Sequence, residues 1–438
     1  MSINFTQQTN HIMKFKLFAL TFFLLIPGLT ILNAQVFKAG AALRVITPKK
    51  LIPISGGIGI PEMPTGKKGD LFVRAIVLEK GATRIAIVSI DNLGWPAYLG
   101  DRSRKMIKGI SPENVLIGAT HGHSSPDAYG FTDEKGNTGT DFKYLDWCVT
   151  QIADAVNEAV AKLEPASLKT AVGEAKGKIA FNSYAENLYD PRCGIIQAIA
   201  ISGKNIGKPI ATLVNYAIHP EILGTDRKLI SPDLCGPLYD RIESKVGGMA
   251  IFMNSAQGGM ITADNRRDNG TRVNDWDECI RIGNLLADEA LRIIEPAPVQ
   301  ENPTIYCASK VIRFPIDSEL LRYVFKNSPM AAKNSNSIDF YTVSTRLNLL
   351  NIGKAQVITI PGEALPNIGF YMKRNMKSDQ SFLFGLTNDA FGYILTKEDF
   401  GSFELYNYIS RTSLGEKTGT IYIEEAIKFI NESPAPVK

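Results

Sequence analysis

The sequence is short of histidine, has no cluster of cysteines and carries no strong excess of one charge. It has four histidines and five cysteines in 438 residues. Its 48 basic and 44 acidic residues give a formal net charge of +4, too small for an electrostatic surface that attracts nucleic acid. Nucleic acid is therefore excluded as an expected partner. At 45% hydrophobic and 21% charged, the composition is that of a globular protein with a sizeable core.

The cysteines argue against a thiolate metal site. They are an odd number at wide and irregular spacings, and none forms a Cys-x-x-Cys pair. Such spacings are not those of a disulfide framework either. We therefore expect buried free thiols at Cys148, Cys193, Cys235, Cys279 and Cys307.

The N-terminal residues have the pattern of a secretory signal peptide. Lys14 and Lys16 precede an apolar run over residues 17–26, and small residues that end at Ala34 provide a cleavage pattern. The pattern predicts a signal peptide over residues 1–34 and a secreted or periplasmic protein. An uncleaved membrane anchor is the alternative, and the Pro and Gly after the apolar run disfavour it.

Beyond this segment, runs with the period of strands alternate with runs with the period of helices. The alternation predicts an α/β fold, a mixed α+β architecture built in layers. The expected strands cover residues 71–78, 84–91, 114–120, 195–201, 209–218, 249–253, 304–314, 342–352, 355–360 and 381–386, and the expected helices cover residues 144–163, 238–245, 277–294 and 422–430. The motifs described next lie on both sides of the Pro-rich stretch 295–303, so we expect residues 35–438 to form a single domain.

Three histidines follow residue 34, and each lies at the end of an apolar strand. His121 and His123 follow the strand that ends at Thr120, and His219 ends the strand that begins at Ala211. Residues two apart in a strand project to the same side, so a His-x-His pair can offer two nitrogens to one metal ion. Polar groups at strand ends collect in one cleft of an open α/β sheet. The alternative is a polar loop in which one imidazole bonds the backbone and the other is exposed.

Two further loops carry groups that fit such a cleft. Glu363 follows a strand that breaks at Pro361 and Gly362, and Tyr393 lies in the polar segment 388–396. Alternatively, Glu363 is an acidic residue at a helix N-terminus, stabilised by the helix dipole, and Tyr393 is a core aromatic. The residues alone leave both alternatives open.

Six short motifs follow one another along nearly the whole of residues 35–438. They are Ile46–Pro48 (ITP), Thr120–Pro126 (THGHSSP), Asn215–Pro220 (NYAIHP), Ile230–Gly236 (ISPDLCG), Pro361–Glu363 (PGE) and Gly392–Phe400 (GYILTKEDF). In this order they resemble the N-terminal catalytic domain of the neutral, or alkaline non-lysosomal, ceramidase family. The resemblance implies that residues 35–438 are a single catalytic domain with that fold, without the C-terminal β-sandwich of full family members.

The resemblance implies that one Zn²⁺ is bound by His121, His219, Glu363 and Tyr393. It places His123 beside the metal, as a proton-transfer group or a support for the ligands. Two imidazoles and a carboxylate suit a catalytic zinc, which polarises a carbonyl and lowers the pKa of bound water. The implied reaction is amide hydrolysis of an N-acyl sphingosine or another N-acyl lipid, a step of sphingolipid metabolism. The implied partners are a lipid or small-molecule substrate and, transiently, a membrane surface.

The sequence departs from the family where the scissile amide would lie. The family motif G-D-x-S-P-N should fall within residues 254–264, which contain no Ser at the required place. Ser255 and Thr262 are the nearest hydroxyls. A tyrosine hydroxyl could also donate to the developing oxyanion. Tyr406 is a candidate for that role, and spacing does not decide between it and Tyr408.

These observations leave three functions. The first is a secreted zinc amidohydrolase acting on ceramide or another N-acyl lipid, which predicts a deep apolar pocket. The second is a zinc hydrolase of the same fold that cleaves an ester or a modified sugar, with a polar cleft lined by Gln257, Asp264, Arg266 and Arg267. The third is a catalytically inactive relative that binds a ligand, and four converging ligands argue against it.

Overall fold

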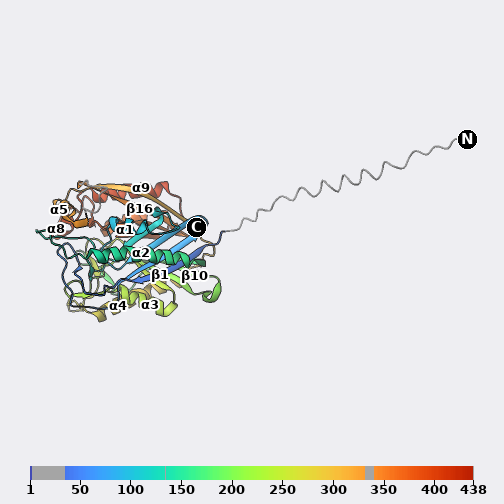
Figure 1. Cartoon of the computed structure of the whole chain (residues 1–438), viewed down its shortest axis with the longest axis horizontal. Coiled ribbons are helices and arrows are strands. Elements are labelled where there is room, and N and C mark those ends of the chain that lie inside the picture. Colours follow the sequence, from blue (N-terminus) through green and yellow to red (C-terminus); the bar gives the residue numbers. More distant parts are fainter. Residues whose placement is uncertain (2–34, 134, 331–339, 438) are drawn as a thin grey trace. The chain divides into compact units, whose positions relative to one another are not determined.

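The computed structural model describes residues 1, 35–133, 135–330 and 340–437 (Figure 1). Residues 36–438 form one compact unit. The predicted signal peptide, apart from Met1, lies outside the described residues. Everything below concerns the compact unit.

An eight-stranded sheet forms the centre of this unit. Its strand order is β13-β11-β10-β8-β1-β4-β5-β6, with parallel pairing between β5 and β6 and between β11 and β13 and antiparallel pairing elsewhere. The strands are β1 (Lys38–Val45), β4 (Phe72–Lys80), β5 (Thr83–Ile90), β6 (Val115–Ala119), β8 (Glu164–Glu174), β10 (Arg192–Ala200), β11 (Pro209–Tyr216) and β13 (Met249–Asn254). Strands such as β6 and β13 are buried along their whole length because both faces of the sheet are covered.

Three long helices cover one face of this sheet. They are α2 (Phe142–Ala161), α3 (Cys235–Val246) and α4 (Trp276–Ile294). The side chains of Asp141 and Asp275 accept hydrogen bonds from the first turns of α2 and α4, which fixes where these helices begin. Helix α2 packs on β1, β4, β5 and β6, and α3 and α4 pack on β10, β11 and β13.

A second sheet covers the other face. It has the order β15-β16-β17-β19, and its Val357 and Phe384 pack against Leu213 and Ile251 of the first sheet. The strands are β15 (Ile305–Pro315), β16 (Thr342–Ile352), β17 (Ala355–Thr359) and β19 (Ser381–Phe384). Its outer face carries α5 (Glu319–Asn327), α7 (Pro366–Asn375) and α9 (Thr418–Glu432).

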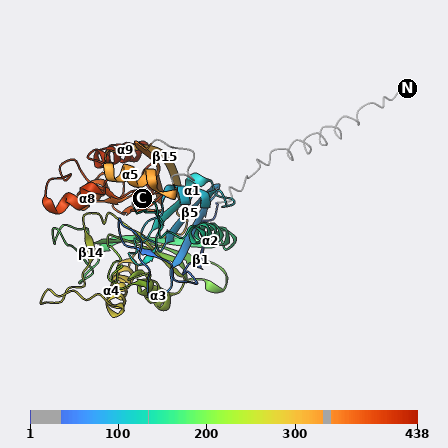
Figure 2. The ribbon, with the colours of Figure 1, turned by 60° about the vertical axis from the view of Figure 1, so that its left-hand side comes forward.

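The result is four layers in the order helix, sheet, sheet, helix. In Figure 2, α9 lies at the top and α3 and α4 lie at the bottom, with the strands between them. Every predicted strand and helix overlaps an observed element of the same type. The predicted mixed α/β layered fold is confirmed.

Short strand pairs carry the connecting loops in which the candidate site residues lie. The pairs are β2 (Ile54–Ser55) with β7 (Ser125–Pro126), β3 (Gly66–Lys67) with β12 (Leu229–Ile230), β9 (Ala180–Asn182) with β14 (Ile261–Ala263), and β18 (Glu363–Ala364) with β20 (Tyr393–Ile394). The remaining elements are α1 (Ala97–Arg104), α8 (Asn407–Arg411) and the 3-10 turns η1 (Pro112–Asn114), η2 (Gly203–Asn205) and η3 (Glu404–Tyr406).

The cysteines form no disulfide. All five lie in the described part of the chain, all are free, and four of them are buried. Within that part, too, no helix has the length and hydropathy that crossing a membrane requires.

Candidate metal centre

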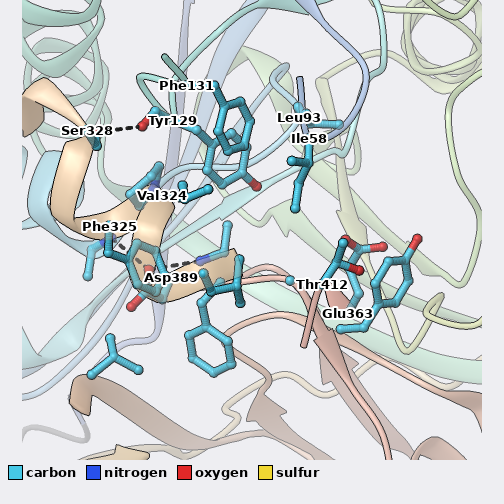
Figure 3. A pocket seen from close by; sticks show the side chains of 18 of the residues that line it. Ile58, Leu93, Tyr129, Phe131, Val324, Phe325, Ser328, Glu363, Asp389 and Thr412 are labelled. Atoms are coloured by element: carbon cyan, nitrogen blue, oxygen red, sulfur yellow. Dashed lines mark hydrogen bonds between the residues drawn. The ribbon is translucent and has the colours of Figure 1, made fainter. Parts of the chain in front are cut away.

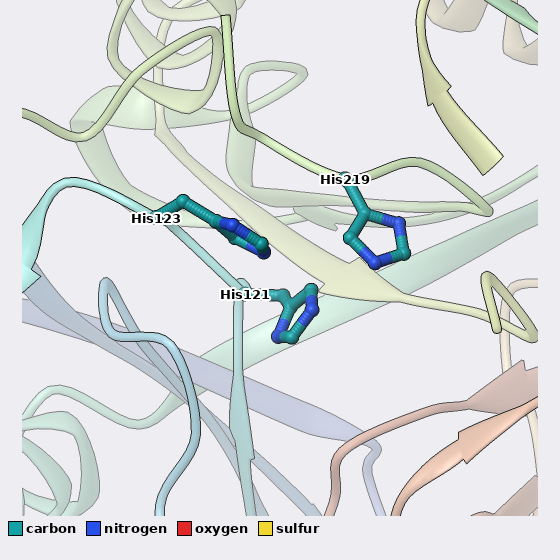
Figure 4. Close-up of side chains that lie close together, drawn as sticks. All are labelled: His121, His123 and His219. Atoms are coloured by element: carbon teal, nitrogen blue, oxygen red, sulfur yellow. The ribbon is translucent and has the colours of Figure 1, made fainter. Parts of the chain in front are cut away.

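The three histidines that follow residue 34 come together at the ends of β6 and β11 (Figure 4). His121 follows β6 and has a positive φ of 72°, a left-handed conformation that turns the chain sharply at this point. Its ring centroid lies 4.7 Å from that of His123 and 4.6 Å from that of His219. A nitrogen from each of the three rings lies within 4.8 Å of the others.

Backbone carbonyls orient two of these rings. His121 Nδ1 lies 2.6 Å from the Leu93 carbonyl oxygen, and His219 Nδ1 lies 2.6 Å from the Ile261 carbonyl oxygen. A carbonyl only accepts hydrogen bonds, so Nδ1 carries the proton in both rings and Nε2 keeps its lone pair. Both Nε2 atoms are thereby prepared to bind a cation, in the way that supporting hydrogen bonds prepare metal-ligating histidines.

Glu363 completes a set of three donors. Its Oε2 lies 3.3 Å from Nε2 of His121 and 3.3 Å from Nε2 of His219, and it has no hydrogen-bond partner among the described residues. Two ligands of a tetrahedral zinc at about 2.0–2.1 Å from the ion are about 3.3 Å apart. The two imidazoles and the carboxylate therefore fit a zinc ion by spacing and by donor chemistry.

The charges of this cluster agree with that fit. Burial would raise the pKa of Glu363, but the neighbouring His121 and His219 outweigh it and hold that pKa well below its ordinary value. Burial would lower the pKa of His219, but the carboxylates of Glu363 and Glu221 outweigh it and raise that pKa above 6.5. The site therefore contains a buried anion that attracts positive charge, supplied by a proton or by a metal.

Tyr393, the fourth implied ligand, lies next to Glu363 but makes a different contact. The two residues are paired in the short β18–β20 ladder, which brings their strands together. The Tyr393 hydroxyl donates to the Met260 sulfur at 3.6 Å. Burial and the charge of Glu363 hold the pKa of Tyr393 well above 10, so the phenol keeps its proton in the absence of a cation.

His123 and an acidic residue that sequence reasoning missed form a second polar pair. His123 Nδ1 lies 3.4 Å from Oε2 of Glu221. Burial lowers the pKa of His123 to about 3, with Glu221 opposing that shift, so the ring is neutral. The signal that could have revealed Glu221 is its place two residues after His219, in the sequence His-Pro-Glu.

A cavity of about 270 Å³ opens beside the cluster (Figure 3). His121, His123, Glu363 and Tyr393 lie in its wall. Most of the remaining wall is apolar, and it includes Leu93, Phe131, Ile316, Leu321, Val324, Phe325, Val343 and Phe391. The cavity therefore has the polar candidate metal ligands in one part of its wall and apolar side chains in most of the rest.

The structure separates the two candidate tyrosines. Tyr408 lines the cavity, whereas Tyr406 does not and packs instead on Tyr184, with ring centroids 5.9 Å apart. Burial and the charge of Glu363 raise the pKa of Tyr408 to about 12, so its hydroxyl is a donor. The structure therefore places Tyr408, and not Tyr406, in the cavity wall, and the oxyanion-donor role stays a prediction.

The two candidate hydroxyls lie outside the cavity wall. Ser255 is buried and its backbone N–H donates to the Tyr216 carbonyl. Thr262 is paired with His219 through a backbone bridge, and its side chain helps to hold the pKa of Glu221 below its ordinary value against the effect of burial. Thr262 is thus next to His219 of the cluster.

The polar residues proposed for a cleft lie away from the cavity wall. Asp264 forms an ion pair with Arg266, at 2.9 Å between Oδ1 and Nε, and Arg267 pairs with Glu278. Gln257 is fully buried. None of these residues lies in the wall of the cavity beside the histidines.

The fold is a four-layer α/β architecture, and the histidine cluster lies at the ends of its strands. The structure of neutral ceramidase from Pseudomonas aeruginosa matches it with a TM-score of 0.74 and 18% sequence identity, over 92% of this chain and 76% of that chain. A ceramidase complexed with C2 matches with a TM-score of 0.72 and 17% identity, over the same shares of the two chains. The chain therefore has the fold of neutral ceramidase, as its motifs predicted. No protein-family model matches the chain, and no curated protein does.

Proposed function

We propose that this protein is a zinc-dependent hydrolase that cleaves the amide bond of an N-acyl sphingosine or another N-acyl lipid. The observation that carries the proposal is the convergence of His121, His219 and Glu363, with two Nε2 atoms each 3.3 Å from one carboxylate oxygen. The ceramidase fold supports the same reaction class. Secretion through residues 1–34 and transient contact with a membrane surface belong to the proposal.

The chain's own groups can carry out the remaining tasks of the reaction. His121, His219 and Glu363 would hold the zinc, with the Tyr393 phenol beside them. A zinc ion bound there polarises a carbonyl and lowers the pKa of water. His123 is neutral and its Nε2 has no partner among the described residues, so that atom can accept a proton at the cavity wall. The Tyr408 hydroxyl can donate to the oxygen of the scissile carbonyl.

The apolar part of the cavity wall supports a lipid as substrate. A chain of methylene groups gains about 0.8 kcal/mol for each group that it buries, so the walls formed by α5 and the loops favour a hydrocarbon. On the apolar part of these walls, a sugar would leave its hydroxyls without partners. The ion pairs of Arg266 and Arg267 also remove the groups that would have bound a sugar.

A direct test is the release of fatty acid from N-acyl sphingosine by the zinc-loaded protein. We expect turnover that stops when the metal is removed by a chelator and returns when zinc is added. An acyl ester with the same hydrocarbon chain serves as the comparison substrate. Zinc-dependent hydrolysis of the ester alone would show that the substrate is an ester and not an amide. Zinc binding without hydrolysis of either substrate would contradict the proposal.

A further inference from the structure

Backbone hydrogen bonds hold Glu221 beside the cluster of His121, His123 and His219. The Glu221 N–H donates to the His219 carbonyl at 3.0 Å across Pro220, a tight turn that returns the chain toward the site. The Pro220 carbonyl in turn accepts a hydrogen bond from the His123 N–H at 3.1 Å. The loops after β6 and β11 are therefore tied together where Glu221 and His123 meet.

The side chains of these residues face each other. Glu221 Oε2 lies 3.4 Å from His123 Nδ1. Glu221 is not in the cavity wall, whereas His123 is. The other ring nitrogen of His123, Nε2, is buried and has no hydrogen-bond partner in the described part of the chain.

We propose that Glu221 is a positioning residue for the hydrolysis proposed above. Its carboxylate accepts the Nδ1–H of His123, and this contact fixes the tautomer and the orientation of the ring, with the Nε2 lone pair free for the substrate. The inference rests on the proposed function for its kinetic consequence, but the tautomer of His123 can be observed without turnover.

The physical argument starts from the neutral imidazole, which has one N–H and one lone pair. A carboxylate accepts hydrogen bonds but donates none, so the proton stays on the nitrogen that faces it. Without Glu221 the proton can move to Nε2, and the ring can rotate within its loop. Either change removes the lone pair from the place where a proton must be accepted.

The test compares Glu221→Ala and Glu221→Gln with the wild-type protein, all loaded with zinc. Glu301→Gln, at an exposed position, is the matched control. The first readout is the nitrogen NMR spectrum of ¹⁵N-histidine-labelled protein, in which His123→Asn assigns the His123 signals. We expect the Nδ1–H tautomer in the wild type, in Glu301→Gln and in Glu221→Gln, whose amide oxygen can still accept. We expect its loss in Glu221→Ala.

The second readout is the kinetics of amide hydrolysis. We expect kcat to fall by about 10- to 100-fold in Glu221→Ala, with KM changed less than about threefold and the zinc content unchanged. Glu221→Gln should recover most of the rate. An Nε2–H tautomer in the wild type, or an unchanged tautomer in Glu221→Ala, would overturn the inference. If no substrate is hydrolysed, the proposed function fails, and the NMR result alone decides the role of Glu221.

Discussion

At the residue scale, Tyr408 lines the cavity and Tyr406 does not. Replacing Tyr408 by Phe removes one hydrogen-bond donor and leaves the ring in place. We expect Tyr408→Phe to lower kcat by about 10²-fold, the cost of losing one donor to an oxyanion, with a smaller change in KM. Steady-state hydrolysis of an N-acyl sphingosine measures both constants.

Tyr406→Phe is the control for that change. Its ring packs on Tyr184 outside the cavity wall, so we expect activity close to that of the wild type. The opposite pattern, with Tyr406→Phe impaired and Tyr408→Phe active, would show that the reacting carbonyl does not lie beside Tyr408 in the cavity.

The histidines could be predicted from the sequence, whereas the only signal for Glu221 is its place two residues after His219. A His-x-His pair after an apolar strand is a pattern with a geometric meaning, because side chains alternate along a strand. Glu221 lies after a proline in a turn, and only the fold shows that this turn points back to His123. Spacing also could not decide between Tyr406 and Tyr408, because the choice depends on where η3 ends and α8 begins.

At the scale of elements, α5 places one face on the cavity and the other in solvent. Val324 lines the cavity, whereas the neighbouring Tyr323 is about half exposed, at 49%. We expect Val324→Trp to fill the cavity and to raise KM for a long-chain N-acyl sphingosine by about tenfold or more, because several methylene groups lose their burial. Tyr323→Trp should leave KM unchanged. Equal KM values for Val324→Trp and the wild type would show that the acyl chain lies elsewhere.

Helix α7 is tied to the start of β10 by a buried ion pair. Lys373 Nζ lies 2.8 Å from Oδ2 of Asp190, and both side chains are nearly inaccessible. Asp190→Asn leaves the ammonium without its partner, so we expect a loss of about 3–5 kcal/mol in the free energy of unfolding. Asp288→Asn, at a partly exposed pair with Arg241, should cost at most about 1 kcal/mol. Urea unfolding of both variants tests the difference, and equal losses would contradict the argument.

The same pair predicts how stability depends on pH. Burial would raise the pKa of Asp190, but Lys373 and Arg192 outweigh it and hold that pKa below 3.8. A carboxyl whose pKa is lower in the folded state stabilises the fold above its unfolded pKa. That contribution is lost as the pH falls below about 4, so the wild type should lose more stability than Asp190→Asn in this range.

The sequence predicts strands that carry a clear local pattern better than those that depend on their neighbours. The run that forms β16 is predicted with the observed bounds, Thr342–Ile352, because its pattern is long and because Val343, Leu347 and Leu349 alternate with polar residues. Strand β8 was not predicted, because its residues alternate poorly and include Pro165. It becomes a strand by pairing with β10 along nearly its whole length, a contact that no local pattern contains.

At the scale of the whole molecule, the site exists because the fold joins distant segments. His121, His219 and Glu363 follow β6, β11 and β17, which belong to two different sheets. Layer order and the two-sheet architecture could not be read from local periodicity. The short motifs predicted the fold because they keep the family's order along nearly the whole of residues 35–438. The structural match to neutral ceramidase agrees with that prediction.

The central claim is that these three side chains bind one zinc ion. Its most direct test is the metal content of the purified protein, measured for the wild type, for His219→Ala and for Lys204→Ala, a control on the exposed turn η2. The account predicts about one zinc per chain in the wild type and in the control, and almost none in His219→Ala. A wild-type protein without zinc, or a His219→Ala variant that keeps it, would contradict the account.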